Sequence, residues 1–356
     1  MPQHVTEENW FFRLSRYAGP LREAIADGRL RIEPAGRRRE VLAFIDRGLE
    51  DFSVSRPAAR AGGWGIPVPG DPDQVIYVWF DALCNYVTAL GYAEDGDAYR
   101  RWWAGGGRRV HLLGKGVLRF HAVYWPAMLL SSGQPLPTDI FVHDYLTAGG
   151  RKISKSSGSA GSEPAALAAE YGADAVRWWL LREVPRIGDA DFTVERLIAR
   201  ADDELANGLG NLVNRVVAMI HRYRDGQAPD RPGRRAIVVD GAEGLDVARR
   251  QAADLAGAAL EQFDFRQATA AVWAIVDEAN RFINRVRPWE LARAERNGAD
   301  PATLDAVLRP LLDACQALGR ELSPFLPDAV ARIAAQCIPG EDGRLPGPSP
   351  VFRRLR

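Results

Sequence analysis

The pattern of apolar and polar positions divides the chain into a mixed front part and a helical rear part. In the front part, runs of β-branched, aromatic and aliphatic residues predict strands at 74–80, 109–113 and 139–143. Helical spacing predicts helices at 7–26 (interrupted near Gly19-Pro20), at 81–90 (capped by Asp81) and at 117–130. The succession strand, glycine turn, helix and strand from 109 to 143 is one βαβ unit. Such units usually form parallel sheets that bind ligands at the carboxyl ends of the strands.

From Glu163 to about Ile338 nearly every segment has helical periodicity. A Pro/Gly/Arg-rich linker at 226–235 interrupts it, and the tail at 339–356 is expected to be loosely packed. One apolar stripe consists of Leu205, Leu209, Leu212, Val216 and Met219. We therefore predict a partial catalytic domain at 1–160, a helical bundle at 161–338 and a tail at 339–356.

The composition is that of an ordinary globular protein, with 47% hydrophobic and 26% charged residues. No uncharged apolar run approaches the ~18–20 residues that span a bilayer, and the first residues lack a signal-peptide core. Cys84, Cys315 and Cys337 form no C-x-x-C pair. We expect no membrane partner, no metal site, no disulfide framework and a cytoplasmic location.

The positive charge is almost entirely arginine. Of 46 Lys and Arg residues only Lys115, Lys152 and Lys155 are lysine, which leaves 43 arginines (46 − 3). A genome bias toward arginine codons explains most of this. Two of the three lysines nevertheless lie three residues apart in a Gly/Ser-rich segment, and lysine with glycine and serine is typical of phosphate binding.

That segment, 149–158 (GGRKISKSSG), closely resembles the KMSKS loop of class I aminoacyl-tRNA synthetases. In amino-acid activation, charge builds on the phosphates that leave as pyrophosphate, and mobile ammonium groups that close on them lower the barrier. The resemblance implies that Lys152, Ser154 and Lys155 bind ATP and that the two lysines are catalytic. Taken alone, the segment could also be a solvated surface loop.

Further segments resemble the methionyl-tRNA synthetase family, notably 75–86 (VIYVWFDALCNY) and 111–128 (HLLGKGVLRFHAVYWPAM). Shorter matches lie at 8–15, 53–56 and 64–69, so the resemblance covers essentially the whole chain. It implies that Lys115 contributes to ATP binding. It also implies that the methionine side chain is held by Trp79, Ala82, Leu83, Tyr86 and His121. Aromatic walls suit a polarizable thioether, although each of these aromatics could instead be a core residue.

In the helical part, 210–215 (GNLVNR) and 287–289 (RPW) resemble the anticodon-reading elements of the same family. The resemblance implies that Asn211, Arg215 and Trp289 bind the anticodon. Asn211 and Arg215 share a helix face at the edge of the apolar stripe, and an exposed Trp289 could stack on an unpaired base. A solvated polar face and a core tryptophan are the alternatives. Phosphate contacts are possible for Arg222, Arg224, Arg281 and Arg285.

The fold implied is α/β: the second half of a class I Rossmann-like catalytic domain followed by an all-α anticodon-binding bundle. The family's first half carries an H-I-G-H motif and a zinc-binding insert, and no two of the five histidines here are spaced as H-x-x-H. No zinc is therefore expected in this chain, while Mg²⁺ arrives with ATP. Two local departures are Gly116, where the family usually has Asp after Gly-Lys, and Ser159 in place of Asn.

These observations predict a methionine–tRNA ligase in a truncated or split form, with ATP, methionine and its tRNA as partners. The alternatives are a catalytically silent tRNA-binding paralogue and an amino-acid-activating enzyme of a small-molecule pathway. Half of a Rossmann-like sheet exposes an apolar edge. We therefore expect the chain to pair with a separate N-terminal synthetase half or with itself, and to form adenylate poorly alone.

Overall fold

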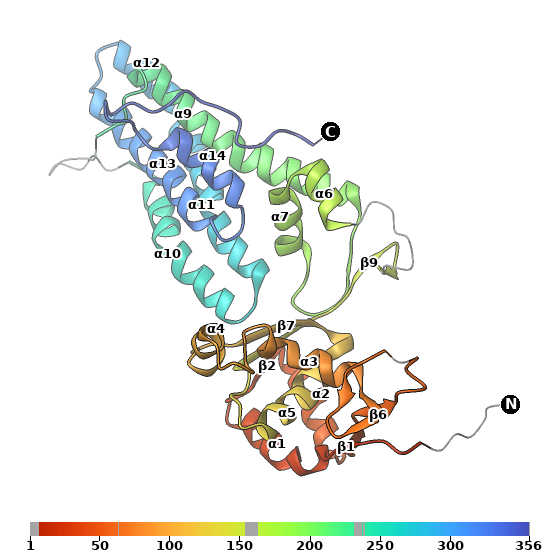
Figure 1. Cartoon of the computed structure of the whole chain (residues 1–356). Coiled ribbons are helices and arrows are strands. Elements are labelled where there is room, and N and C mark those ends of the chain that lie inside the picture. Colours follow the sequence, from red (N-terminus) through yellow and green to blue (C-terminus); the bar gives the residue numbers. More distant parts are fainter. Residues whose placement is uncertain (1–6, 63, 154–162, 231–236, 238, 356) are drawn as a thin grey trace. The chain divides into compact units, whose positions relative to one another are not determined.

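The computed structural model describes residues 7–62, 64–153, 163–230, 237 and 239–355. The chain forms two compact units, Met1–Asp144 and Tyr145–Arg356 (Figure 1). Each unit is described by itself below. The division precedes the KMSKS-like loop, whereas the sequence suggested a boundary at 160; as a boundary between functional domains, residue 160 stays a prediction. No helix among the described residues is long and apolar enough to cross a membrane.

The first unit is built on a three-stranded sheet in the order β2 (Arg31–Glu33), β8 (Asp139–His143), β7 (Val110–Gly114). Both strand pairs are parallel, so the predicted βαβ unit is confirmed. The crossover from β7 to β8 consists of η3 (Lys115–Val117), η4 (Phe120–Tyr124) and α5 (Trp125–Ser131). Because the strands are parallel, their carboxyl ends lie at one sheet edge, with Gly114 beside His143.

The helix predicted at 7–26 is wrong in its first half. Phe11–Phe12 is strand β1, which pairs with β3 (Phe52–Ser53), and η1 (Leu14–Tyr17) precedes α1 (Ala18–Ala26). Gly19-Pro20 begins α1 and does not interrupt it, because proline is tolerated in a first turn, where its missing N–H has no partner to lose. The helix α2 (Ala35–Asp46) follows β2.

A small antiparallel sheet leads to the next helix. Its strands are β4 (Ser55–Pro57), β6 (Asp71–Ile76) and β5 (Pro67–Val68), in that order. The strand predicted at 74–80 therefore ends at Ile76, and α3 spans Val78–Thr88 with Tyr77 as its N-cap. Asp81 lies in the first turn and is not the cap. The spacing of the buried Leu83 and Val87 is helical, and this overrides the β propensity of the preceding aromatic run. Farther along, α4 (Asp97–Tyr99) continues into η2 (Arg100–Ala104).

The second unit begins with three short strands. β9 (Leu146–Ala148) pairs antiparallel with β10 (Arg151–Lys152) and parallel with β11 (Ala190–Asp191). Apart from β11, the predicted helical character of 163–338 is confirmed. The helices are α6 (Pro164–Tyr171), α7 (Ala173–Glu183), α8 (Val194–Arg200), η6 (Ala201–Gly210), α9 (Asn211–Arg224), α10 (Ala242–Glu261), α11 (Phe265–Val286), α12 (Pro288–Arg296), α13 (Pro301–Glu321) and α14 (Pro327–Cys337).

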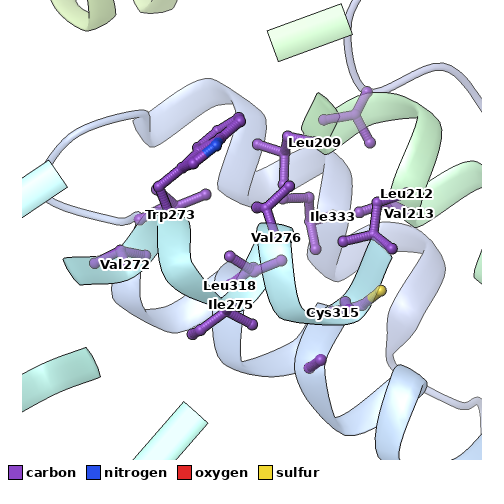
Figure 2. Packing of buried hydrophobic residues seen from close by; sticks show 14 of the residues in the cluster. Leu209, Leu212, Val213, Val272, Trp273, Ile275, Val276, Cys315, Leu318 and Ile333 are labelled. Atoms are coloured by element: carbon purple, nitrogen blue, oxygen red, sulfur yellow. The ribbon is translucent and has the colours of Figure 1, made fainter. Parts of the chain in front are cut away.

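The core of this unit lies where α9, α11, α13 and α14 meet. Figure 2 shows Leu209 and Leu212 packed near Val276 and Ile333. The predicted stripe is confirmed, since its leucines and Val216 are fully buried and Met219 packs at the margin of the cluster. This continuous apolar face fixes which side of α9 remains available for polar side chains.

Two features of the second unit differ from the sequence expectation. The tail is not loosely packed: Leu345 and Val351 are buried, and the Val351 carbonyl accepts a hydrogen bond from Arg332. Leu345 and Val351, together with Phe352 and Leu355 at the margin of the core, dock an otherwise polar segment. The cysteines Cys315 and Cys337, distant in sequence, lie together and fully buried, and their contact and burial raise the pKa of Cys315.

Candidate methionine, nucleotide and anticodon sites

The helix α3 presents four of the five predicted methionine-binding residues. Trp79, Ala82, Leu83 and Tyr86 follow the i, i+3, i+4, i+7 spacing of one helix face. Leu83 is buried, whereas Trp79, Ala82 and Tyr86 are partly exposed. A helix face that is only partly covered by its own unit is what a ligand pocket requires.

The fifth residue, His121, lies on η4 and is joined to Tyr86. The distance from the Tyr86 hydroxyl to His121 Nε2 is 2.9 Å, and that from His121 Nδ1 to the Val117 carbonyl is 3.0 Å. A carbonyl can only accept, so Nδ1 carries the proton and Nε2 accepts from the tyrosine. Burial lowers the pKa of His121, although the bond to Val117 opposes this, and burial raises the pKa of Tyr86. Both side chains are therefore neutral near pH 7, and together they form a fixed polar pair.

A second histidine, which sequence reasoning did not select, supports this pair. His111 on β7 packs its ring 4.3 Å from that of Tyr86, and its Nε2 accepts a hydrogen bond of 3.3 Å from Trp125. Burial, aided by the nearby His121, lowers the pKa of His111 from 6.5 to about 4. His111 is thus neutral, and its ring packs against that of Tyr86. The sequence carried no signal for this, because the alternation of Val110, His111 and Leu112 would place the two apolar residues inward, whereas the structure exposes them.

A largely apolar cavity of about 250 Å³ is lined in part by Trp79. Trp79 stacks on Phe120, with ring centroids 4.2 Å apart and planes inclined by 18°. The cavity is lined by Phe52, Ser53, Arg56, Tyr77, Trp79, Phe80, Leu83, Phe120, Tyr124 and Met128. Only Trp79 and Leu83 of the predicted set line it, while Tyr86 and His121 form the neighbouring polar pair. Sequence reasoning missed Phe120 and Tyr124, whose i, i+4 spacing beside His121 could have indicated them.

Lys115 lies at the carboxyl end of β7, directly after Gly114. Its ammonium nitrogen is 3.4 Å from Oδ1 of Asp144, the residue that follows β8. The predicted nucleotide-binding lysine therefore occupies the edge of a parallel sheet where ligands of such sheets usually bind.

The KMSKS-like loop is described only at its start. Gly149 and Gly150 adopt positive φ angles of 58° and 74°, which turn the chain from β9 into β10. Asp191 accepts hydrogen bonds from the Thr147 hydroxyl (2.6 Å) and the Gly150 N–H (2.9 Å). These bonds lower the pKa of Asp191. The side chain of Lys152 and the whole of Ser154 and Lys155 lie outside the described residues, so their predicted roles stay predictions.

The predicted anticodon residues lie on α9 and α12. Asn211 is exposed and Arg215 partly buried on the first turns of α9, beside the buried stripe. Trp289 is 44% exposed, which rules out the core reading of that residue. The left-handed conformation of Arg287 (φ 51°) ends α11 and lets Pro288 begin α12, which presents Trp289 outward.

Trp289 lines a basic pocket of about 340 Å³ together with Arg222, Arg293 and Arg296. Arg222 lies about 16 Å along α9 from Asn211, at 1.5 Å per residue. Trp289 and Asn211 therefore do not line the same site. Of the four arginines considered for phosphate contacts, Arg224 is committed to Glu295 and Asp305 inside the unit. Arg281 and Arg285 are exposed and pair with Glu278 and Asp240, respectively.

Comparison with known proteins agrees with this arrangement. The family model described as tRNA synthetases class I (M) matches residues 1–217. The methionine–tRNA ligase of Caldanaerobacter subterraneus subsp. tengcongensis is 40% identical over 335 residues, which are 94% of this chain and 50% of that protein. The methionine–tRNA ligase of Brucella melitensis is 37% identical over 370 residues, with 98% and 68% covered. The chain belongs to the class I methionyl-tRNA synthetase family.

A solved structure of the family has the same fold. Methionyl-tRNA synthetase of Mycobacterium tuberculosis bound by methionyl-adenylate superposes with a TM-score of 0.85 at 33% identity. The match covers 98% of this chain and 69% of that one. The predicted fold, part of a class I catalytic domain followed by a helical bundle, is confirmed. The chain spans about half the length of several methionyl-tRNA synthetase relatives that it matches.

Proposed function

We propose that this chain supplies the methionine-binding and tRNA-binding parts of a methionine–tRNA ligase. The enzyme activates methionine with ATP and transfers it to the tRNA. The observation that carries the proposal is the Tyr86–His121 pair beside the Trp79–Phe120 stack. The pair lies beside the apolar cavity that Trp79 and Phe120 line, and an apolar cavity with neutral polar groups next to it suits an unbranched thioether side chain.

In this proposal the residues divide the reaction between them. Trp79, Ala82, Leu83, Tyr86 and His121 hold the methionine side chain. Lys115 and Ser154 contact ATP, and the ammonium groups of Lys152 and Lys155 stabilise the charge that develops on the departing pyrophosphate. Mg²⁺ would enter with ATP and screen the same phosphates. Asn211, Arg215 and Trp289 would meet different bases of the anticodon, because an unstacked loop extends over the separation along α9.

The catalytic histidines of the family have no counterpart in these 356 residues, since no H-x-x-H occurs. We propose that an N-terminal synthetase half supplies them, either from further residues of the same protein or from a second chain. An exposed edge of the sheet supports this part of the proposal. Strand β7 lies at one edge of the described sheet, and its Leu112 is 63% exposed on the face opposite to His111. A parallel strand of that half would pair with β7, and helices of that half would cover Leu112 and Val110 on the sheet face.

The test is methionine-dependent ATP–pyrophosphate exchange, measured for the purified chain and for the chain co-expressed with a family N-terminal half that contains H-I-G-H. We expect weak or no exchange by the chain alone and activity on co-purification with the second half. Exchange that remains absent in the reconstituted complex contradicts the proposal. Light scattering of the chain alone reports whether self-association covers the β7 edge instead.

A silent tRNA-binding paralogue is the second candidate, and Gly116 together with the missing H-x-x-H favours it. It predicts a gel shift with methionine tRNA but no adenylate formation in any reconstituted complex. The intact Tyr86–His121 pair speaks against it, because an RNA-binding protein does not need a methionine pocket. A third candidate, activation without tRNA, predicts that exchange survives while tRNA charging is absent.

A further inference from the structure

The carboxyl ends of three neighbouring strands gather Arg37, Lys115 and Asp144. Asp144 directly follows β8, and Lys115 directly follows β7, whose last residue lies beside His143. Arg37 is in the first turn of α2, just after β2. Arg37 Nη2 lies 2.5 Å and Lys115 Nζ 3.4 Å from Asp144 Oδ1. The side chain of Asp144 is only 6% exposed, so this carboxylate is largely removed from solvent and its geometry is fixed by two cations.

The short turn that begins at Lys115 is held at its other end, Val117, by His121 of the proposed methionine pocket. The Val117 carbonyl accepts from His121 Nδ1, and His121 Nε2 accepts from Tyr86. Lys115–Val117 is a single turn, η3. One ion pair and one hydrogen bond therefore set its position from opposite ends, and a shift of Lys115 would be transmitted to the carbonyl that orients His121.

The middle residue of this turn is Gly116, where the family usually has Asp after Gly-Lys. Position 116 lacks a carboxylate, but Asp144, just after the neighbouring strand β8, supplies one that contacts Lys115. A carboxylate supplied by the next parallel strand can act on the same ammonium group, because the two strand ends are in register.

We propose that Asp144 is a positioning residue for ATP and methionine binding, and that it replaces the carboxylate missing at position 116. It holds the Lys115 ammonium at the sheet edge and, through Lys115–Val117, steadies His121. The inference rests on the proposed function for the role of Lys115 in ATP binding. Arg37 orients the Asp144 carboxylate, and it belongs to the same arrangement.

The small number of lysines permits a direct test of the contact that needs no substrate. Reductive methylation with ¹³C-formaldehyde labels Lys115, Lys152, Lys155 and the N-terminal amine, and Lys115→Arg assigns the Lys115 signal. Asp144→Asn is expected to move that signal and to leave the signals of Lys152 and Lys155 in place. The matched control is Asp46→Asn, which removes a comparable aspartate–arginine pair with Arg22 on the surface of the same unit. An unmoved Lys115 signal in Asp144→Asn overturns the proposal.

The second arm measures exchange kinetics in the reconstituted synthetase. Asp144→Asn is expected to raise KM for ATP by about tenfold, with a smaller rise in KM for methionine, as expected when binding geometry is lost. Adding Gly116→Asp to Asp144→Asn should recover most of that loss, a result that general destabilisation would not give. If Asp144→Asn does not fold, Asp144→Glu keeps the charge and is expected to raise KM for ATP about threefold.

The two arms separate the failure of this inference from that of the proposed function. A moved Lys115 signal with an unchanged KM for ATP makes Asp144 a structural residue only and contradicts the positioning role. Absence of exchange in the wild-type complex contradicts the proposed function. In that case the methylation arm still shows whether Asp144 holds Lys115.

Discussion

The proposed methionine pocket and the proposed anticodon surface use tryptophan in opposite ways. Trp79 is stacked on Phe120, and the nearby rings of Tyr86, His111 and His121 pack against one another. Trp289 is 44% exposed and lies among arginines, with no stacked aromatic partner among the described residues. A small apolar ligand gains its binding energy from enclosure, so its aromatics must be preorganised by their neighbours. A nucleobase supplies its own ring as the stacking partner, so its tryptophan must be left uncovered.

The same contrast extends to charge. The two imidazoles beside Tyr86, those of His111 and His121, are kept neutral by burial, which lowers the pKa of both, and Arg56 is the one guanidinium among the described residues that line the adjoining cavity. The groups around Trp289 are permanently charged guanidiniums. A neutral polar end suits a thioether, and a cationic rim suits a phosphate backbone. The two sites should therefore respond independently to mutation, and to pH in different ways.

The largest expected effect is on the stability of the first unit at acid pH. The folded-state pKa of His111, about 4, is below its ordinary value of 6.5, so the unfolded chain binds a proton first as the pH falls. Stability is fully present above pH 6.5 and is lost between pH 6.5 and 4, by at most about 3 kcal/mol. His111→Gln, which keeps an acceptor for Trp125, should remove most of this loss. The measurement is urea unfolding at pH 7 and pH 4.5.

His221→Gln, in the helical unit, is the control for that experiment and should retain the whole pH-dependent loss. An equal pH dependence in His111→Gln and in the wild type would contradict the assignment of the loss to His111. That result would also contradict the view that the stability of the first unit depends on a neutral, buried imidazole.

The next effect concerns the wall of the pocket. Trp79→Ala removes the stacking partner of Phe120 and opens the apolar slot, so KM for methionine in the exchange reaction should rise on the order of 100-fold. Binding of methionine tRNA in a gel shift should stay unchanged. Trp102→Ala, at an exposed tryptophan of the same unit, is the control. Equal losses in the two variants would indicate a general effect of removing a ring.

The reciprocal test is Trp289→Ala. Loss of one base stack should weaken tRNA binding by roughly 1–3 kcal/mol, between about fivefold and about 150-fold, without changing KM for methionine. Trp289→Phe retains a ring and should recover much of the affinity. If Trp289→Ala altered methionine activation and left tRNA binding intact, the proposed division between the two sites would be wrong.

Several features of this comparison could be predicted from the sequence because they depend on local patterns. The strand Asp139–His143 has the predicted bounds, since three consecutive apolar, strand-favouring residues (Ile140, Phe141 and Val142) form its centre. The stripe from Leu205 to Val216 predicted the buried face of α9 and therefore the outward edge on which Asn211 lies. Motif resemblance selected Trp79, Tyr86 and His121, although spacing alone could not distinguish them from core aromatics.

Other features depend on contacts between distant segments and left no local signal. Asp144 reaches Lys115 only because β7 and β8 end in register, and Asp191 reaches Gly150 only because β11 pairs with β9. The tail was expected to be loose because it is rich in Pro and Gly. The burial of Leu345 and Val351 depends on a groove that the helices create. The boundary at Asp144–Tyr145 likewise follows from packing and not from composition.

The smallest expected effect tests whether the polar end of the pocket acts as one unit. Tyr86→Phe keeps the ring beside His111 but removes the hydroxyl that donates to His121 Nε2, which leaves a buried acceptor without that donor. We expect a loss of about 1 kcal/mol, or about fivefold in KM for methionine. Tyr92→Phe, at an exposed tyrosine of the same unit, should change KM for methionine by less than about twofold.

The decisive comparison is a double-mutant cycle between these two side chains. If Tyr86 acts through His121, Tyr86→Phe should have almost no further effect in a His121→Ala background, since the acceptor is already gone. Additive losses would mean that the two residues contact methionine separately. The hydrogen bond between them would then be incidental to binding, and the contrast between an enclosed, preorganised pocket and an open stacking surface would rest on the Trp79–Phe120 stack alone.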